Sequence, residues 1–155
     1  MNTIENAKNE LKSKKLTFVA MGVNFTWEEA NYHTGLLLNK LREDKNCLSG
    51  TVAAAHRIGR ADALLLCYGG IRELFAELIT IPGIEALRYS GVKVIYEELV
   101  DVILPDRAPE AAALEQKCLD IHSAFQAYEF FDQLLPREEA AGKVCPCEAE
   151  EAAEA

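Results

Sequence analysis

Two similar segments in the middle of the chain constrain its fold more than any other feature. Residues 66–76 read LCYGGIRELFA and residues 87–97 read LRYSGVKVIYE. Each has Leu-x-Tyr, a small residue, a glycine, a β-branched residue and a base. A glycine after an Ala- and Leu-rich run is typical of a helix end, and the run after it is typical of a buried strand. Two consecutive helix–strand units predict parallel strands with helices packed against the sheet.

The glycine pair at 69–70 also allows two other interpretations, a hairpin turn and a phosphate-binding loop. A phosphate loop follows a strand and ends in Gly-Lys-Ser or Gly-Lys-Thr, whereas here a run of helix formers, ADALLLCY, comes first. We therefore interpret residues 51–68 as one helix that ends at the pair. Gly59 would then lie inside this helix at a cost of about 1 kcal/mol, and we expect it to mark a close approach to another backbone.

The rest of the chain alternates helical and strand patterns. Ser49 is a candidate N-cap for the helix over 51–68, and Thr80 followed by Pro82 is typical of a helix start. Gly91 occupies the position of a left-handed residue after a helix. Further elements are expected as a helix over 2–15, a hairpin of strands over 16–21 and 25–29, a helix over 33–44, and one or two helices over 110–135.

Length and charge limit the classes of function. The 155 residues suit one domain, which we place at 1–135, and residues 136–155 form an acidic tail that we expect to be disordered. A net charge of -9 argues against binding to a nucleic-acid backbone. The polar segment MNTIENAKNELKSKK and the absence of a long apolar run predict a cytoplasmic protein that does not enter a membrane.

Five cysteines leave one thiol over in any pairing, which predicts free thiols in a reducing compartment. Cys145 and Cys147 form a Cys-x-Cys pair in the tail. Two thiolates without a histidine make half of a tetrahedral metal site. The pair is interpreted as a loose thiol pair, with intermolecular metal or redox chemistry, and hence a thiol-dependent accessory protein, as the alternative.

The order hairpin, long helix, strand, second helix and strand resembles the cytidine-deaminase-like fold. The chain is similar to an uncharacterised family of small prokaryotic proteins with that fold, from about residue 16 to residue 135. The similarity is strongest over IGRADALLLCYGGIRELFA and GVKVIYEELV. It implies an α/β three-layer sandwich, with a mixed sheet, an N-terminal hairpin and helices on both faces.

The zinc ligands of the deaminases have no counterpart in the alignment that follows from these helices. Zinc deaminases begin the two core helices with His/Cys-x-Glu and Pro-Cys-x-x-Cys. The aligned segments here are AAH at 54–56 and PGIEA at 82–86, in which alanine and glycine replace ligands. We therefore expect no metal, no cofactor and no zinc-dependent deamination. The family's own Cys-Pro-x-Glu patch corresponds to AALE at 112–115, where Glu115 alone matches.

Four residues are the candidate ligand-binding set, placed at the N-termini of the two core helices. His56 would exchange a proton with the ligand or contact an anion, and Arg57 would contact an anion. Thr80 would form hydrogen bonds at the backbone edge of the site, and Glu115 would recognise a polar group of the ligand. The expected ligand is a small nucleotide-like metabolite. A solvated polar helix face is the other interpretation of His56 and Arg57.

Aromatic residues suggest two other roles. WEEANYH at 27–33 could stack a base, although an interface or the edge of the core is favoured. FQAYEFFDQLL at 125–135 has aromatic residues at helical spacing, which indicates core packing or a dimer surface. The alternative function is therefore a structural module that acts as a homodimer through its C-terminal helices.

Overall fold

The computed structural model describes residues 3–103 and 106–135, and the predicted acidic tail lies outside these residues. Five strands form one mixed sheet in the order β2-β1-β3-β4-β5, which confirms the predicted α/β class. The elements are α1 Ile4–Ser13, β1 Phe18–Met21, β2 Thr26–Glu29, α2 Thr34–Glu43, β3 Val52–Ile58, α3 Arg60–Gly69, β4 Glu73–Thr80, α4 Ile81–Tyr89, β5 Lys93–Val100, α5 Pro109–Lys117 and α6 Ala124–Leu134.

The pairing of the strands confirms the predicted hairpin and the predicted parallel strands. β1 pairs antiparallel with both β2 and β3, whereas β3, β4 and β5 run parallel to one another. Ala54 of β3 lies opposite Val19 of β1 and Phe75 of β4, and Phe75 lies opposite Ile95 of β5. β3 is thus the central strand, with paired neighbours on both sides.

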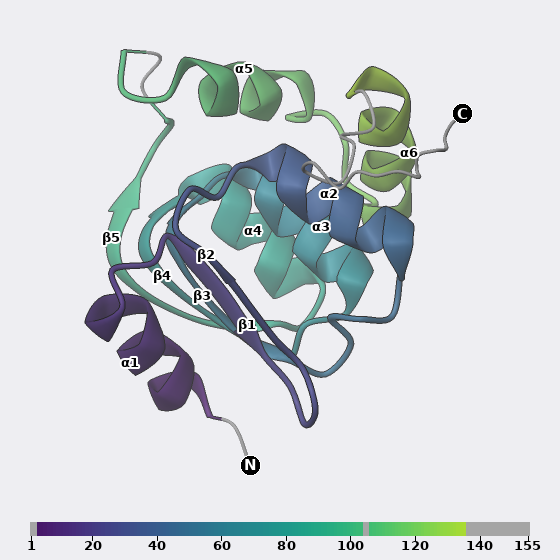
Figure 1. The fold of residues 1–155 in the computed structure, drawn as a ribbon. Helices are drawn as coiled ribbons and strands as arrows, with labels where there is room; N and C mark the ends of the chain where they lie inside the picture. The colour runs from purple at the N-terminus through teal and green to yellow at the C-terminus, as the bar shows by residue number, and fades with distance from the viewer. Residues whose placement is uncertain (1–2, 104–105, 136–155) are drawn as a thin grey trace.

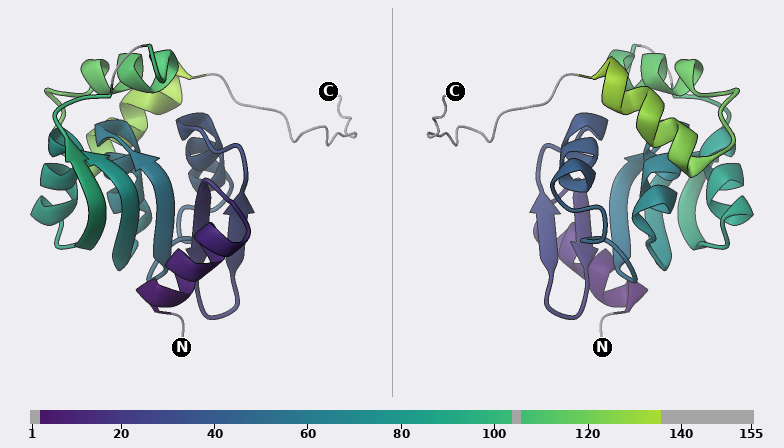
Figure 2. Two further views of the ribbon diagram at one scale, coloured as in Figure 1. Left: turned by 90° about the vertical axis from the view of Figure 1, so that its left-hand side faces the viewer. Right: turned by 90° about the vertical axis from the view of Figure 1, so that its right-hand side faces the viewer.

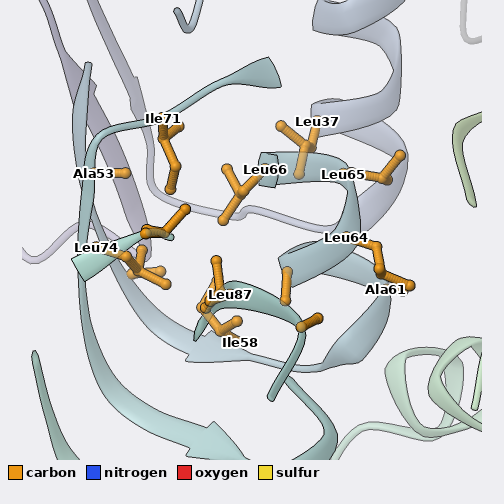
Figure 3. Close-up of a cluster of buried hydrophobic side chains, with 14 of the residues drawn as sticks. Leu37, Ala53, Ile58, Ala61, Leu64, Leu65, Leu66, Ile71, Leu74 and Leu87 are labelled. Atoms are coloured by element: carbon orange, nitrogen blue, oxygen red, sulfur yellow. The ribbon is translucent and has the colours of Figure 1, made fainter. Parts of the chain in front are cut away.

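Helices cover both faces of the sheet (Figures 1 and 2). α1 packs alone on one face, where Leu11 and Phe75 belong to a small buried cluster. α2, α3 and α4 lie on the other face over the main core, in which Leu66, Leu74 and Leu87 approach one another (Figure 3). α5 lies across the top of the sheet in Figure 1, and α6 packs against α3 and α2. No helix in residues 3–103 and 106–135 is long and apolar enough to cross a bilayer.

The single helix expected over 51–68 is wrong, because β3 occupies its first half and α3 its second. The strand reads VAAAHRI and is fully buried over residues 52–55. Alanine favours helices in isolation, but its small side chain also fits a central strand that is covered on both faces, and tertiary pairing overrides propensity. Ser49 lies in the turn before β3 and caps no helix. His56 and Arg57 consequently belong to a strand.

Because residues 52–58 form a strand, the alignment of residues 54–56 with the first zinc motif is also wrong. Residues 54–56 lie in β3, whereas α2, α3 and α4 begin at Thr34, Arg60 and Ile81. The second aligned segment, 82–86, does lie in the first turns of α4.

Gly59 marks a close approach of two backbones, as expected, but it does so as the N-cap of α3. A Cβ atom on Gly59 would lie 2.8 Å from the Cδ1 atom of Ile103. A Cβ atom on Gly83 would lie 3.2 Å from the carbonyl atoms of Gly59. The start of α3 and the start of α4 are therefore in direct backbone contact.

The predicted helix ends are confirmed at Gly70 and Gly91, which have φ angles of 81° and 82°. The Gly70 N–H donates to the carbonyl groups of Leu66 and Cys67 and closes α3. Thr80 is the N-cap of α4, as predicted, and its hydroxyl accepts from the Gly83 N–H at 3.1 Å. The glycines at 69–70 thus end a helix and lead into β4.

We expect Gly70→Ala to lower the free energy of unfolding by about 1–2 kcal/mol, because a Cβ atom is unfavourable in the left-handed conformation. Space does not limit the substitution, since the nearest atom, Ser49 Oγ, lies 3.6 Å from the added Cβ. Gly70→Asn should cost less, because asparagine tolerates this conformation. Urea denaturation measures both variants, and an alanine variant as stable as the parent would contradict the assignment.

Candidate functional site

A cleft of about 670 Å³ lies where the N-termini of three helices meet. Residues 32–35 at the start of α2, Asp62 in the first turn of α3, and residues 107–111 at the start of α5 line it. Arg57, near the end of β3, and Leu114 of α5 complete much of the wall. This volume is within the range of small-molecule sites in proteins.

Asp62 is the buried acidic group of the cleft, with only 5% of its surface exposed. Its Oδ1 atom accepts hydrogen bonds from the Tyr32 hydroxyl at 2.6 Å and the Thr34 hydroxyl at 2.8 Å. Its Oδ2 atom accepts from the Gly59 N–H at 3.3 Å. Burial raises the pKa of the Asp62 carboxyl above its ordinary value, although these hydrogen bonds and the charge of Arg57 oppose the shift.

A ring contact and a backbone hydrogen bond fix the position of Tyr32, so its hydroxyl is held in place for Asp62. The ring stacks on Phe18 with a centroid distance of 4.7 Å, and the Tyr32 N–H donates to the Thr17 hydroxyl at 2.9 Å. Burial raises the pKa of the Tyr32 phenol, and the negative charge of Asp62 raises it further. Tyr32 is therefore a neutral hydrogen-bond donor at physiological pH.

Two basic side chains also line the cleft. Arg57 is half-buried and Arg107 is exposed, and the exposed Glu110 in the first turn of α5 lines the cleft with them. The N-caps of α2 and α5 are His33 and Ala108, and neither side chain caps its helix. The first N–H groups of these two helices and the positive ends of their dipoles therefore favour an anion.

A second polar cluster lies behind the cleft and is centred on Glu115 of α5, which is 2% exposed. Its Oε2 atom accepts from the Thr80 hydroxyl at 2.5 Å and from the Arg60 N–H at 3.0 Å. Its Oε1 atom accepts from the Ile103 N–H at 3.4 Å. One carboxylate thus joins α5 to the start of α3, to the start of α4 and to Ile103 in the segment that follows β5.

Arg60 extends this cluster toward α6. Its guanidinium donates to the carbonyl oxygens of Cys118 at 3.0 Å, Pro82 at 2.9 Å and Ile121 at 2.6 Å. The side chain is almost fully buried. Together, Glu115 and Arg60 hold the C-terminal end of α5, which forms one wall of the cleft.

The structure places the four candidate residues in three different environments. Arg57 lines the cleft. Thr80 and Glu115 lie together, but they are buried and bonded to each other behind it. His56 is exposed on the α1 side of the sheet, where its Nδ1 atom lies 2.7 Å from Glu77 Oε1, so its side chain is on the other face of the sheet from Arg57.

Asp62, Thr34 and Arg107 line the cleft but were not predicted from the sequence. Tyr32 was identified only as part of an aromatic segment that could stack a base. A signal existed for Asp62, because an acidic residue in the first turn of a helix interacts with that helix end. The error over residues 51–58 concealed that signal, since it placed Asp62 in mid-helix.

The described cysteines are poorly suited to thiol chemistry. Burial raises the pKa of the Cys118 thiol to about 12 and also raises the pKa values of Cys47 and Cys67. Such thiols are mostly protonated at neutral pH and react slowly. Cys145 and Cys147 lie outside the described residues. Within residues 3–103 and 106–135, no three His, Cys, Asp or Glu side chains are grouped to hold a metal ion.

Comparison with known families gives an assignment over most of the chain. The sequence profile of a domain of unknown function, DUF1893, matches residues 6–135. The chain belongs to the DUF1893 family. The predicted membership in a family of unknown function is thus confirmed, whereas no curated protein matches the chain.

A solved member of the DUF1893 family has the same overall fold. The crystal structure of a DUF1893 family protein (TM1506) from Thermotoga maritima is similar with a TM-score of 0.74. The alignment covers 85% of this chain and 89% of that one, at 16% sequence identity. At this identity the likeness establishes the fold of the chain and leaves its ligand open.

We expect Asp62→Asn to remove a pH dependence that the raised pKa creates. The folded state holds the Asp62 proton more tightly than the unfolded state, whose carboxyl titrates near 3.8. Wild-type stability relative to the variant should therefore fall as pH rises from about 4 through the raised pKa. Urea denaturation of both proteins at several pH values measures this difference. A difference that stays constant, or grows with pH, would contradict the assignment.

We expect Thr80→Val to lower the free energy of unfolding by about 1–3 kcal/mol, because the substitution leaves the Gly83 N–H without an acceptor and removes a donor from Glu115. Thr80→Ser keeps the hydroxyl and is the matched control. Thr80→Ser should lower the free energy of unfolding clearly less than Thr80→Val does. Chemical denaturation compares the two, and equal stabilities would show that the hydroxyl contributes nothing.

Proposed function

We propose that this DUF1893 protein binds a small anionic, nucleotide-like metabolite in the cleft between α2, α3 and α5. The proposal rests on the presence of anion-binding groups and a buried hydrogen-bonded carboxyl in the same cleft. Arg57, Arg107 and two helix N-termini without side-chain caps supply positive charge and N–H donors, and the Tyr32–Thr34–Asp62 group supplies a buried carboxyl. A ligand with a phosphate-like group and a hydrogen-bonding ring matches both kinds of group.

The anionic group of the ligand would lie beside Arg57 and Arg107. Guanidinium groups bind phosphate oxygens through charge-assisted hydrogen bonds, and helix N-termini supply backbone N–H donors. α2 has ten residues and α5 has nine, so each has a full set of aligned peptide dipoles. Arg57 is the anchor of choice because its half-buried side chain starts from a rigid central strand.

The remainder of the ligand would lie between Tyr32 and α5. Leu114, Ala111 and Ala113 supply apolar wall for a ring. Asp62 Oδ2 has one long hydrogen bond, to the Gly59 N–H, and so retains acceptor capacity for an N–H group of the ligand. An amino- or imino-bearing ring such as a nucleobase satisfies this acceptor.

We also infer that the fold is of the cytidine-deaminase-like type without its zinc. With the corrected elements, two of the three helices that begin at the cleft, α2 and α3, start with His33-Thr34-Gly35 and Gly59-Arg60-Ala61-Asp62. His33 and Asp62 are the side chains in these two segments that could bind zinc, and a catalytic zinc site in proteins has three protein ligands. The residues present therefore do not fit the metal, and the proposed activity is binding.

The proposal predicts that a nucleoside 5′-monophosphate stabilises the protein in a thermal-shift assay, and that the matching nucleoside stabilises it less. Arg57→Ala should weaken binding by about tenfold or more, because a charge-assisted hydrogen bond is lost. His56→Ala is the matched control, since the neighbouring residue faces the other side of the sheet and should leave affinity unchanged. Calorimetric titration measures all three proteins.

Two outcomes would contradict the proposal. One is no stabilisation by nucleosides, nucleotides or inorganic phosphate at millimolar concentration. The other is equal weakening of binding by the Arg57 and His56 substitutions, which would place the ligand outside the cleft.

A further inference from the structure

We propose that β5 is the contact through which two copies of this chain associate, by antiparallel pairing of β5 with β5 about a two-fold axis at Ile95. The two five-stranded sheets would become one continuous sheet. This inference does not depend on ligand binding in the cleft, and it uses a different part of the molecule.

β5 is a long edge strand with an open side. It is last in the strand order, and in the described part of the chain no strand pairs with its outer edge (Figure 1). Its eight residues contain no proline, and three large apolar side chains are exposed by 37–41%: Ile95, Tyr96 and Leu99. An unpaired edge strand is where a further strand adds to a sheet, and the charged residues Lys93, Glu97 and Glu98 restrict which strand can add here.

The hydrogen bonding with β4 determines which backbone groups of β5 point outward. The Lys93 N–H donates to the Arg72 carbonyl at 3.4 Å, so Lys93 points toward β4. Backbone groups alternate in direction along a strand. Val94, Tyr96 and Glu98 therefore direct their N–H and C=O groups away from the sheet, where a second β5 could bond them.

This alternation limits the two-fold registers, because outward residues must lie opposite outward residues. The axis must then pass through a residue and not between two residues, and the central residues of β5 are Ile95, Tyr96 and Glu97. An axis at Glu97 opposes two like charges, and an axis at Tyr96 places Ile95 opposite Glu97. With an axis at Ile95, Lys93 of each copy lies opposite Glu97 of the other copy, and Val94 of each copy lies opposite Tyr96 of the other. Each of these pairs occurs twice, and the two Ile95 residues lie opposite each other.

The Ile95 register is thus the one with complementary charges and matched apolar pairs. Both side chains of the charged pair lie on the α1 face of the sheet, because Glu97 contacts Lys12 of α1 at 2.9 Å and residues two apart share a face. Opposite charges and apolar pairs directly across two strands are stabilising, whereas like charges are not. Charge complementarity therefore selects a second copy of this chain as the occupant.

The aromatic residues of α6 are a weaker candidate for this contact. Phe125 is 55% exposed, but it approaches Tyr68 with a centroid distance of 6.3 Å, and Phe130 contacts Phe131 at 5.2 Å. These rings already have partners within the chain, whereas no strand of the described residues pairs with the outer edge of β5. The α6 surface is the competing outcome of the experiment below.

Cysteine cross-linking tests the register directly. Cα atoms in a non-hydrogen-bonded antiparallel pair lie about 4.5 Å apart, which a disulfide can bridge. In the full chain with Cys145→Ser and Cys147→Ser, the added Ile95→Cys substitution should give a disulfide-linked dimer under mild oxidation. Leu99→Cys, on the same strand and similarly exposed, and Tyr96→Cys should remain unlinked. Circular dichroism confirms that the three variants fold.

Sedimentation without cross-linking completes the test. The parent chain should sediment as a dimer, Lys93→Glu should shift it to monomer, and adding Glu97→Lys to that variant should restore the dimer. A monomeric parent chain at concentrations of about 100 μM, well above the Kd expected for a specific contact, would overturn the proposal. A dimer insensitive to Lys93→Glu, or linked at Leu99 or Tyr96, would also overturn it.

Discussion

The buried carboxylate of Glu115 is the interaction on which the architecture of the cleft depends. It accepts hydrogen bonds from Thr80, Arg60 and Ile103, which come from three segments far apart in the sequence. A buried carboxylate left without these donors would be strongly unfavourable, so α5 is held where all three donors converge. Since α5 forms one wall of the cleft, the position of this wall follows from the hydrogen bonds of Glu115.

The sequence was sufficient to predict the elements that carry their own local signals. Gly70 and Gly91 end helices in the left-handed conformation, and Thr80 begins one, because these residues satisfy the free backbone groups of helix ends. The central strand carries no such signal. Its Val-Ala-Ala-Ala run forms a strand only because β1 and β4 pair with it on both sides, and that context is non-local.

The cleft was predictable only in part for the same reason. Arg57 was identified from its charge, and the contact between Thr80 and Glu115 joins two of the other predicted residues. Asp62 and its hydroxyl donors lie about thirty positions apart, and their meeting depends on how α2 packs beside α3. The assignment of β3 as a helix then placed His56 on the wrong face of the sheet.

The central claim is that the cleft binds a nucleotide-like anion, and a two-dimensional amide NMR titration with a nucleoside 5′-monophosphate tests it most directly. The backbone N–H groups of Gly35 and Ala111 lie at the starts of α2 and α5 and should show the largest, saturable shifts, together with Arg57. Shifts confined to α1 or β5, or no saturable shifts at millimolar ligand, would contradict the account.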